Sequence, residues 1–388
     1  MFQNLLAKNK QILLACLSFF IFLAGQAQQV KPAAYQTNYY LPLLKNKKIA
    51  VVANQTSTLD NKHLVDFLLD SNVEVMKVFA PEHGFRGKQD AGAKIEDGID
   101  TKTRLPILSL YGSNKKPTKD QLLNVDMIVF DIQDVGARFY TYISTLHYVM
   151  EAAAESDIPV VLLDRPNPNA HYIDGPVLKP GYESFVGMHP VPVVYGMTIG
   201  EYGLMINGEG WLANKVQCNL IVVPIKNYNH EIPYELPIKP SPNLPNAKSI
   251  NLYPSLCFFE GTPISAGRGT EMQFQIYGAP ELNPEDFIFP FTPKPNEGAK
   301  YPKFKNQICH GEDLRNSPKL NQIDLSWLIK AYQASENDFF NAFFAKLAGT
   351  DQLENQIKAG LSSEQVRATW QQDLEEFKLI RNNYLLYP

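Results

Sequence analysis

A hydrophobic run that ends in a carboxylate and an imidazole is the first feature of this chain that could do chemistry. The segment reads Val78-Phe79-Ala80-Pro81-Glu82-His83-Gly84-Phe85-Arg86-Gly87. In open α/β sheets, ligands bind outside the carboxyl ends of the strands, so polar residues just past a buried strand are candidates for a functional site. An apolar flank favours the protonated, proton-donating form of a carboxyl group, and Glu82 has such a flank. The alternative is a strand-to-loop turn in which Glu82 faces solvent.

A second carboxylate, Glu260, also follows an apolar run. We predict a strand around residues 255–259, which ends in Cys257-Phe258-Phe259 just before Glu260, and a glycine-rich stretch follows at residues 261–270. Glycosidic cleavage usually requires two carboxyl groups, one to protonate the leaving oxygen and one to activate water or attack the sugar. Glu82 and Glu260 are therefore candidates for such a pair, although the sequence does not show that they meet.

Polar clusters follow three more predicted strands. They are Asn54-Gln55-Thr56, Asp131-Ile132-Gln133-Asp134 and Asp164-Arg165-Pro166-Asn167-Pro168. Each cluster alone is ordinary turn chemistry, because Asp, Asn, Gly and Pro are common in loops. Since parallel strands end at one edge of a sheet, we predict that these clusters and Glu82 converge on one functional crevice.

Arginines and aromatic residues accompany the predicted crevice. Arg86, Arg138 and Arg165 fall in its loops, and Arg268 lies in the glycine-rich stretch. A guanidinium group fits a carboxylate or a phosphate, although Arg165 could equally pair with its neighbour Asp164. Aromatic rings there could stack on a sugar, although core packing is their commoner use; the candidates are Tyr111, Phe139, Tyr140, Tyr142 and Tyr195.

The elements that would position these residues alternate between strands and helices. We expect strands at residues 48–54, 73–79, 107–111, 127–131 and 159–163, and helices at 63–70 and 144–156. The apolar runs are continuous, which indicates strands covered on both faces and hence a parallel, Rossmann-like sheet. No G-x-G-x-x-G motif follows the first strand, so we expect no dinucleotide cofactor.

The second half of the chain indicates a smaller α+β domain. A helix is expected at residues 198–211, with Thr198 as N-cap and Glu201 completing a capping box. Further strands are expected at 220–223 and around 255–259, and helices near 325–334, 338–348 and 363–381. With about 360 residues after the leader, two domains are the natural expectation, and we place them at 28–176 and 177–388.

The N-terminal residues predict export. Lys8 and Lys10 precede an apolar run at residues 12–24, and small residues follow, which is typical of a Sec-type signal peptide spanning 1–27. We therefore expect a periplasmic or extracellular protein without a membrane span. Lipidation at Cys16 is the less favoured alternative, because this residue lies inside the apolar run.

Cysteine content and charge exclude several classes of protein. The three cysteines after the leader, Cys218, Cys257 and Cys309, are too few and odd in number for a disulfide framework. No Cys or His pair has the spacing of a zinc site, so we expect no structural metal. A net charge of -4 gives no basic face for nucleic acid.

Four long motifs in fixed order resemble those of the NamZ-type exo-β-N-acetylmuramidases. They are residues 81–87, 131–142 and 164–168, and Phe259-Glu260-Gly261-Thr262 with Gly267-Arg268-Gly269-Thr270. The resemblance covers nearly the whole mature chain. It implies release of N-acetylmuramic acid from the non-reducing end of peptidoglycan fragments, without a cofactor, at a site between a Rossmann-like domain and a smaller C-terminal domain.

The resemblance also suggests roles for individual residues. The catalytic glutamate of the family falls on Glu82, and Glu260 as its partner is our own inference. Muramic acid carries a lactyl carboxylate that an arginine could bind through two hydrogen bonds. Our candidate substrate-binding residues are Asn54, His83, Gly84, Arg86, Asp131, Arg138, Tyr140, Arg165 and Arg268.

Two other functions fit the same residues. His83, Asp131 and Asp134 could form a metal site of a cell-envelope hydrolase or deacetylase, which a chelator would inactivate. A non-catalytic sugar-binding protein would show a similar crevice and would bind without turnover. The stereochemical course of the reaction, the aglycone preference and the oligomeric state stay open at this point.

Overall fold

The computed structural model describes residues 29–82, 84–86, 97–335 and 338–388. The predicted signal peptide with Cys16 lies outside the described residues, and so does the candidate site residue His83.

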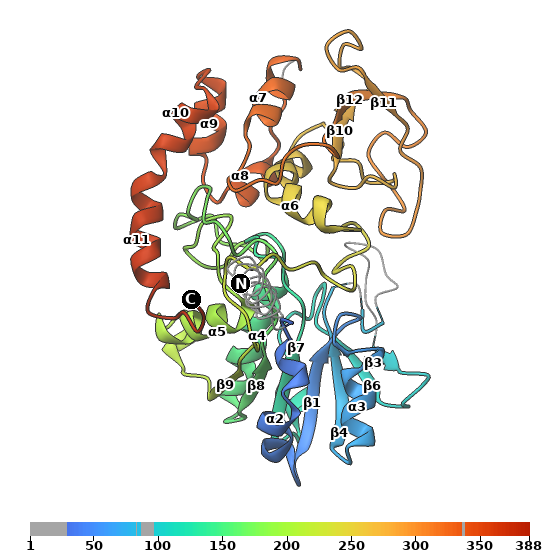
Figure 1. Cartoon of the computed structure of the whole chain (residues 1–388), viewed down its shortest axis with the longest axis vertical. Helices are drawn as coiled ribbons and strands as arrows, with labels where there is room; N and C mark the ends of the chain where they lie inside the picture. The colour runs from blue at the N-terminus through green and yellow to red at the C-terminus, as the bar shows by residue number, and fades with distance from the viewer. Residues whose placement is uncertain (1–28, 83, 87–96, 336–337) are drawn as a thin grey trace, which may run out of the picture.

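Within the described residues, seven strands form one sheet in the order β5-β6-β4-β1-β7-β8-β9 (Figure 1). Their bounds are β1 (Lys48–Ala53), β4 (Glu74–Ala80), β5 (Gly98–Ile99), β6 (Pro106–Ser109), β7 (Met127–Asp131), β8 (Val160–Leu163) and β9 (Leu220–Val223). Every neighbouring pair is parallel except β5 and β6, which are antiparallel. The predicted α/β fold with a Rossmann-like parallel sheet is therefore confirmed.

Alternate residues of β1 enter two different cores, which explains its continuous apolar sequence. Ala50 and Val52 belong to a core that includes α4 (Tyr142–Glu155) and α5 (Ile199–Gly208). Ile49 and Val51 belong to a second core that includes α2 (Thr37–Leu44) and α3 (Leu64–Asp70). Helices thus cover both faces of the sheet, as the strand composition predicts.

The sheet extends further along the chain than the sequence suggests. β9 pairs with β8 in parallel, from Val160 opposite Leu220 to Leu163 opposite Val223. The expected strand at 220–223 is therefore correct, but it completes the first sheet instead of starting the second domain. Because α5 packs on β9 and α4, the Rossmann-like unit continues well past our predicted boundary near Pro176.

The remaining C-terminal part contains a small antiparallel sheet and a group of helices (Figure 1). Its strands run in the order β10-β12-β11, with bounds β10 (Ile276–Ala279), β11 (Phe289–Phe291) and β12 (Cys309–Asp313). Its helices are α6 (Ala247–Leu256), α7 (Ser326–Gln333), α8 (Ala342–Ala348), α9 (Gln352–Lys358), α10 (Ser363–Thr369) and α11 (Gln371–Arg381). Short elements complete the chain: the hairpin β2 (Thr58–Leu59) and β3 (Lys62–His63), and the 3₁₀ turns η1 (Ala33–Tyr35), η2 (Asp120–Leu122), η3 (Ala213–Lys215) and η4 (Cys257–Gly261).

The structure corrects two predicted elements. Residues 255–259 are not a strand: α6 ends at Leu256 and the 3₁₀ turn η4 follows directly. This apolar run contains no β-branched residue, and so short a run does not distinguish a strand from a buried helix. The single helix expected at 363–381 is two helices, α10 and α11, which are separated at Trp370.

The predicted capping box agrees with the structure. Thr198 caps α5 and forms the expected capping box with Glu201. Cys218, Cys257 and Cys309 are buried free thiols. In the part of the chain that the structure describes, no helix combines the length and apolarity needed to cross a membrane.

Candidate active site

Glu82 lies just past the carboxyl end of β4 and is half-buried. The Thr141 hydroxyl, at the N-cap of α4, donates to its Oε2 atom at 3.0 Å. The Tyr111 hydroxyl also hydrogen-bonds to Glu82, and burial together with this carboxylate raises the pKa of Tyr111, so the phenol stays a neutral donor. Gly84 has a φ of 77° and its N–H donates to the Pro81 carbonyl, a turn that favours glycine. The Glu82 carboxylate is therefore held by hydroxyl groups from two neighbouring segments.

A pocket opens beside Glu82 and takes its walls from both parts of the molecule. Its lining residues are Glu82, Phe139, Tyr140, Thr141, Ser241, Asn243, Leu244, Tyr253, Arg268 and Phe274. The hollow has a volume of about 60 Å³, so a ligand that enters it leaves most of its bulk outside. The structure thus brings three predicted site residues together here, namely Glu82, Tyr140 and Arg268. We call this space the Glu82 pocket.

Aromatic rings form one wall of the Glu82 pocket. Tyr140 lies edge-to-face with Tyr253, with ring centroids 6.0 Å apart, and Tyr253 lies edge-to-face with Phe274 at 4.9 Å. The Tyr140 hydroxyl donates to the Pro240 carbonyl at 2.9 Å, which fixes this wall to the segment that follows β9. Such rings offer flat apolar surface next to polar groups, as a sugar requires.

The proline-rich segment 233–245 supplies pocket residues that the sequence analysis missed. It contributes Ser241, Asn243 and Leu244, and the Gln55 side chain donates to its Lys239 and Pro240 carbonyls. Asn243 is 2% exposed, and its side-chain N–H donates to the Gly298 carbonyl at 2.8 Å. Proline-rich composition indicates a connecting segment, and the burial that makes Asn243 part of the pocket is visible only in the structure.

Arg268 and Glu260 form an ion pair at the Glu82 pocket. Arg268 Nε lies 2.9 Å from Glu260 Oε1, and its guanidinium carbon lies 5.0 Å from the Phe274 ring centroid. Burial alone would raise the pKa of Glu260, but Arg268 and Lys303 outweigh it and hold this pKa below its usual value. Lys303 also donates to three carbonyls of residues 259–264, so the segment that carries Glu260 is firmly held. Glu260 is thus an ionised partner of Arg268.

Three of the other predicted site residues have structural partners. Asp131 and Arg165 are both buried and form two hydrogen bonds, with Arg165 Nε 2.5 Å from Asp131 Oδ1 and Nη2 2.8 Å from Oδ2. Arg165 therefore pairs with Asp131, not with Asp164 as we considered. Asn54 is buried, and its side-chain oxygen accepts hydrogen bonds from the Thr56 amide and hydroxyl, which shapes the turn after β1.

Arg138 is not at the crevice. It is 0% exposed, and its guanidinium donates to the carbonyls of Pro176, Val191, Leu347 and Ala348. Burial lowers the pKa of Arg138 to about 9. In the structure this arginine instead joins the first part of the molecule to α8.

Arg86 lies at the rim but is also paired. Its Nη2 atom lies 2.7 Å from Asp100 Oδ2, and its guanidinium carbon lies 4.4 Å from the Phe85 ring centroid. Of the four candidate arginines, Arg268 is the one that lines the Glu82 pocket.

The two carboxylates of the proposed metal site, Asp131 and Asp134, have other partners in the described part of the chain. Asp131 binds Arg165, and Asp134 accepts hydrogen bonds from the Tyr195 hydroxyl and the Gly136 amide. No group of three or more His, Cys, Asp or Glu side chains suited to a metal ion occurs among the described residues.

Comparison with known proteins identifies the family. Residues 49–248 match the family described as exo-β-N-acetylmuramidase NamZ, N-terminal, and residues 251–387 match its C-terminal counterpart. The chain belongs to the NamZ family. The two matches meet between residues 248 and 251, at the start of α6 and well beyond our predicted boundary.

Individual relatives support this assignment. The peptidoglycan β-N-acetylmuramidase NamZ of Bacillus subtilis is 37% identical over 377 residues, which cover 90% of this chain and 89% of that protein. A DUF1343 family protein of Bacteroides fragilis has a crystal structure that matches with a TM-score of 0.87 at 47% identity, covering 93% of this chain and 99% of that one. A second DUF1343 protein of the same organism matches with a TM-score of 0.79 at 29% identity, covering 92% and 99%. The resemblance seen in the sequence motifs is therefore confirmed over nearly the whole fold.

Proposed function

We propose that this protein is an exo-acting glycosidase that releases N-acetylmuramic acid from the non-reducing end of peptidoglycan fragments. The observation that carries the proposal is that Glu82 and Arg268 line one pocket in a member of the NamZ family. A carboxyl group beside a cation suits a sugar that has both a scissile glycosidic oxygen and a carboxylate.

In this proposal Glu82 is the proton donor. Its proton passes to the glycosidic oxygen as the bond between that oxygen and the anomeric carbon breaks, so that the aglycone leaves as a neutral alcohol. A water molecule supplies the hydroxyl group that the anomeric carbon takes up, and the proton released from this water returns Glu82 to its acid form. Thr141 and Tyr111 orient the carboxyl group, and the aromatic wall of Tyr140 and Tyr253 flanks the sugar. Glu260 is ionised and paired, and its role is to hold Arg268 in place.

Arg268 is the proposed ligand of the lactyl carboxylate. Its Nε–H is used by Glu260, while its terminal N–H groups have no hydrogen-bond partner among the described residues. A guanidinium with free N–H groups fits a carboxylate in a bidentate manner. The same carboxylate is absent from N-acetylglucosamine, so Arg268 would select muramic acid.

We also propose that the enzyme is exported to the periplasm or the extracellular space. Support comes from Lys8 and Lys10 ahead of the apolar run at residues 12–24 and the small residues after it. An exported enzyme would meet cell-wall fragments directly.

The direct test uses chromogenic glycosides of N-acetylmuramic acid and N-acetylglucosamine with the purified protein. We expect turnover of the first, with little or none of the second, and full activity in the presence of a chelator. Equal cleavage of both sugars would contradict the role of Arg268. Binding without turnover would instead favour a sugar-binding protein, and loss of activity in chelator would favour the metal-dependent hydrolase.

A further inference from the structure

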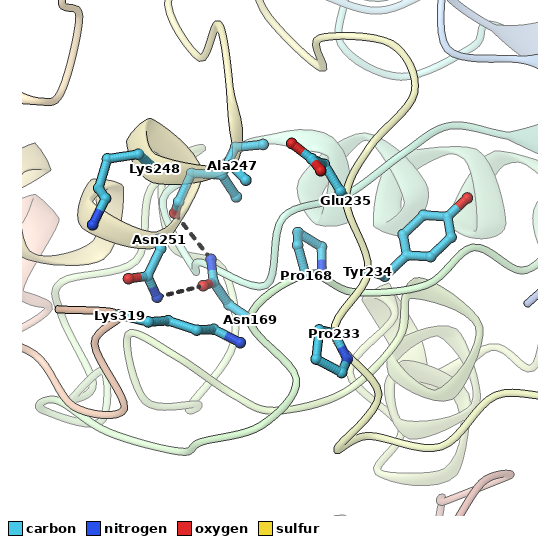
Figure 2. Close-up of a pocket in the computed structure, with 10 residues that line it drawn as sticks. Pro168, Asn169, Pro233, Tyr234, Glu235, Ala247, Lys248, Asn251 and Lys319 are labelled. Carbon is cyan, nitrogen blue, oxygen red and sulfur yellow. Dashed lines mark hydrogen bonds between the residues drawn. The ribbon is translucent and has the colours of Figure 1, made fainter. Parts of the chain in front are cut away.

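A second, larger pocket lies on the same edge of the sheet as Glu82. It has a volume of about 450 Å³, within the usual range for a small-molecule site. Its lining residues are Pro168, Asn169, Pro233, Tyr234, Glu235, Ala247, Lys248, Ile250, Asn251 and Lys319 (Figure 2). We call it the distal pocket.

The position of the distal pocket follows from the order of the strands. Pro168 and Asn169 follow β8, whereas Glu82 follows β4, and β1 and β7 lie between these strands. Three strand spacings of about 4.8 Å, or about 14 Å in all, therefore separate β4 from β8 along this edge. The proline-rich segment 233–245 runs along this edge, since its first residues line the distal pocket and residues 241–244 line the Glu82 pocket.

The floor of the distal pocket is rigid. Asn169 is fully buried, and its side-chain nitrogen donates to the Val135 carbonyl at 2.9 Å and to the Ile250 carbonyl at 3.1 Å. Asn251 donates to the Leu320 carbonyl at 3.0 Å and accepts from the Leu320 amide at 2.7 Å. These bonds connect the loop after β8, helix α6 and the loop that carries Lys319, so the pocket is formed before any ligand arrives.

Two charged side chains of the distal pocket, Lys319 and Glu235, are available to bind a ligand. Lys319 and Glu235 are exposed, lie on opposite sides of the pocket in Figure 2, and have no ion-pair or hydrogen-bond partner among the described residues. The ammonium of Lys248 donates to the Ser317 carbonyl and points away from Glu235 and from the Lys319 ammonium in Figure 2. The apolar faces of Pro168, Pro233 and Ile250 lie between these groups. Such a site suits a sugar unit that carries a carboxylate.

We infer that the distal pocket binds a second carboxylate-bearing sugar unit of the same glycan, on the leaving-group side of the cleaved bond. Lys319 binds the carboxylate, and Glu235 accepts hydrogen bonds from hydroxyl or amide groups of the sugar. The inference rests on the proposed function, because an exo-acting enzyme that holds the terminal sugar at Glu82 leaves the rest of the chain outside that pocket. Muramic acid recurs at every second position of such a chain, so a carboxylate is available beyond the first linkage.

The carboxylate has two possible sources, which the test separates. It is either the lactyl carboxylate of a peptide-free muramic acid or a carboxylate of the peptide stem attached to that lactyl group. Both present the same chemistry to Lys319.

The test compares long and short substrates. We would measure kcat/KM for the short chromogenic muramic acid glycoside, a peptide-free tetrasaccharide and a stem-bearing tetrasaccharide, each with wild type and with Lys319→Met. In wild type the tetrasaccharides should have the lower KM, and raised salt should reduce this advantage. In Lys319→Met the ratio of kcat/KM for the tetrasaccharide to that for the short glycoside should fall about tenfold, through KM. A fall confined to the stem-bearing substrate identifies the stem carboxylate, and a fall with both identifies the lactyl group.

A matched control keeps the inference separate from the proposed function. Lys45 is exposed and lies at the opposite end of the sheet, between α2 and β1, so Lys45→Met should keep the wild-type ratio. An unchanged ratio in Lys319→Met, with wild-type melting temperature, would overturn the distal site while leaving the glycosidase intact. Absence of turnover of every substrate by wild type would overturn the proposed function itself.

Discussion

At the scale of single residues, the proposed catalytic group depends on hydroxyl groups that hold it. Thr141 and Tyr111 come from different elements and both contact the Glu82 carboxyl group. Holding a proton donor in one orientation contributes to the rate because the reacting atoms are already aligned.

Loss of the Thr141 hydroxyl should slow the reaction. In Thr141→Val the carboxyl group of Glu82 loses a 3.0 Å hydrogen bond, and we expect kcat on the muramic acid glycoside to fall about tenfold with little change in KM. Tyr142→Phe is the matched control, because the Tyr142 hydroxyl makes its 3.4 Å bond to the backbone oxygen of Glu82 and not to the carboxyl group. An equal effect of both substitutions would show that the Thr141 hydroxyl has no special role.

Replacement of Arg268 should change substrate selection. Arg268→Gln removes the charge that we assign to the lactyl carboxylate, so kcat/KM for the muramic acid glycoside should fall at least tenfold. The low activity on the N-acetylglucosamine glycoside should change far less. Steady-state kinetics with both glycosides measure this difference, and a parallel loss with both sugars would contradict the assignment.

Which candidate residues reach the Glu82 pocket depends on partners that the sequence does not reveal. Glu82 was predictable, because an acid after a buried strand lies at the edge where ligands bind. The arginines were not distinguishable, since Arg165 is paired with Asp131, 34 positions away, and Arg138 reaches carbonyls more than 200 positions away. Pairing over such separations is decided by tertiary packing.

At the scale of elements, local signals were reliable where side chain and backbone interact within one turn. The capping box of α5 is such a signal, and the structure contains it. The apolar run before Glu260 is the opposite case, because its hydrophobicity fits a strand and a buried helix equally, and helix α6 with η4 occupies it.

The cap of α5 should contribute more stability than an exposed cap. Thr198 accepts from the Glu201 amide at 3.2 Å and donates to buried Asp164 at 2.7 Å. We therefore expect Thr198→Ala to lower the free energy of unfolding by about 2 kcal/mol. Ser362→Ala, in the exposed capping box of α10, should cost about 0.5–1 kcal/mol. Chemical denaturation measures both values, and an equal cost would mean that the bond to Asp164 adds nothing.

At the scale of the whole molecule, the seven-stranded sheet and the C-terminal region share more than the sequence implied. The sheet takes its last strand, β9, from the second half of the chain, and Arg138 binds carbonyls near α8. Parallel pairing leaves no local turn signal, so the partner of β8 could not be recognised from sequence.

Buried histidines should make the molecule less stable in acid. His147 Nδ1 lies 2.9 Å from His189 Nε2, and His189 is bonded to Tyr202 and stacked on Trp211. Burial lowers the pKa of both histidines, and the neighbouring His147 lowers the pKa of His189 further. Glu151 opposes the shift at His147. The unfolded chain takes up protons below about pH 6.5 that the native state does not, so the free energy of unfolding should decrease as pH falls below this value.

Denaturation at several pH values checks this dependence. Wild type should lose up to about 1.4 kcal/mol per pH unit for each such histidine below about pH 6.5. His189→Gln should have a shallower dependence, whereas His310→Gln, in the small sheet, should keep the wild-type slope. Identical slopes in all three proteins would show that this pair does not control the acid response.

Glu82 as the proton donor is the central assignment for this enzyme, and one comparison tests it most directly. It is kcat of Glu82→Gln against wild type on the chromogenic muramic acid glycoside, with melting temperatures recorded for both proteins. We predict a fall of about 10²–10⁴ with a melting temperature close to that of wild type, because the amide keeps the shape of the side chain but has no acidic proton. A variant that retains kcat within a few-fold of wild type would contradict the assignment and place the proton donor elsewhere.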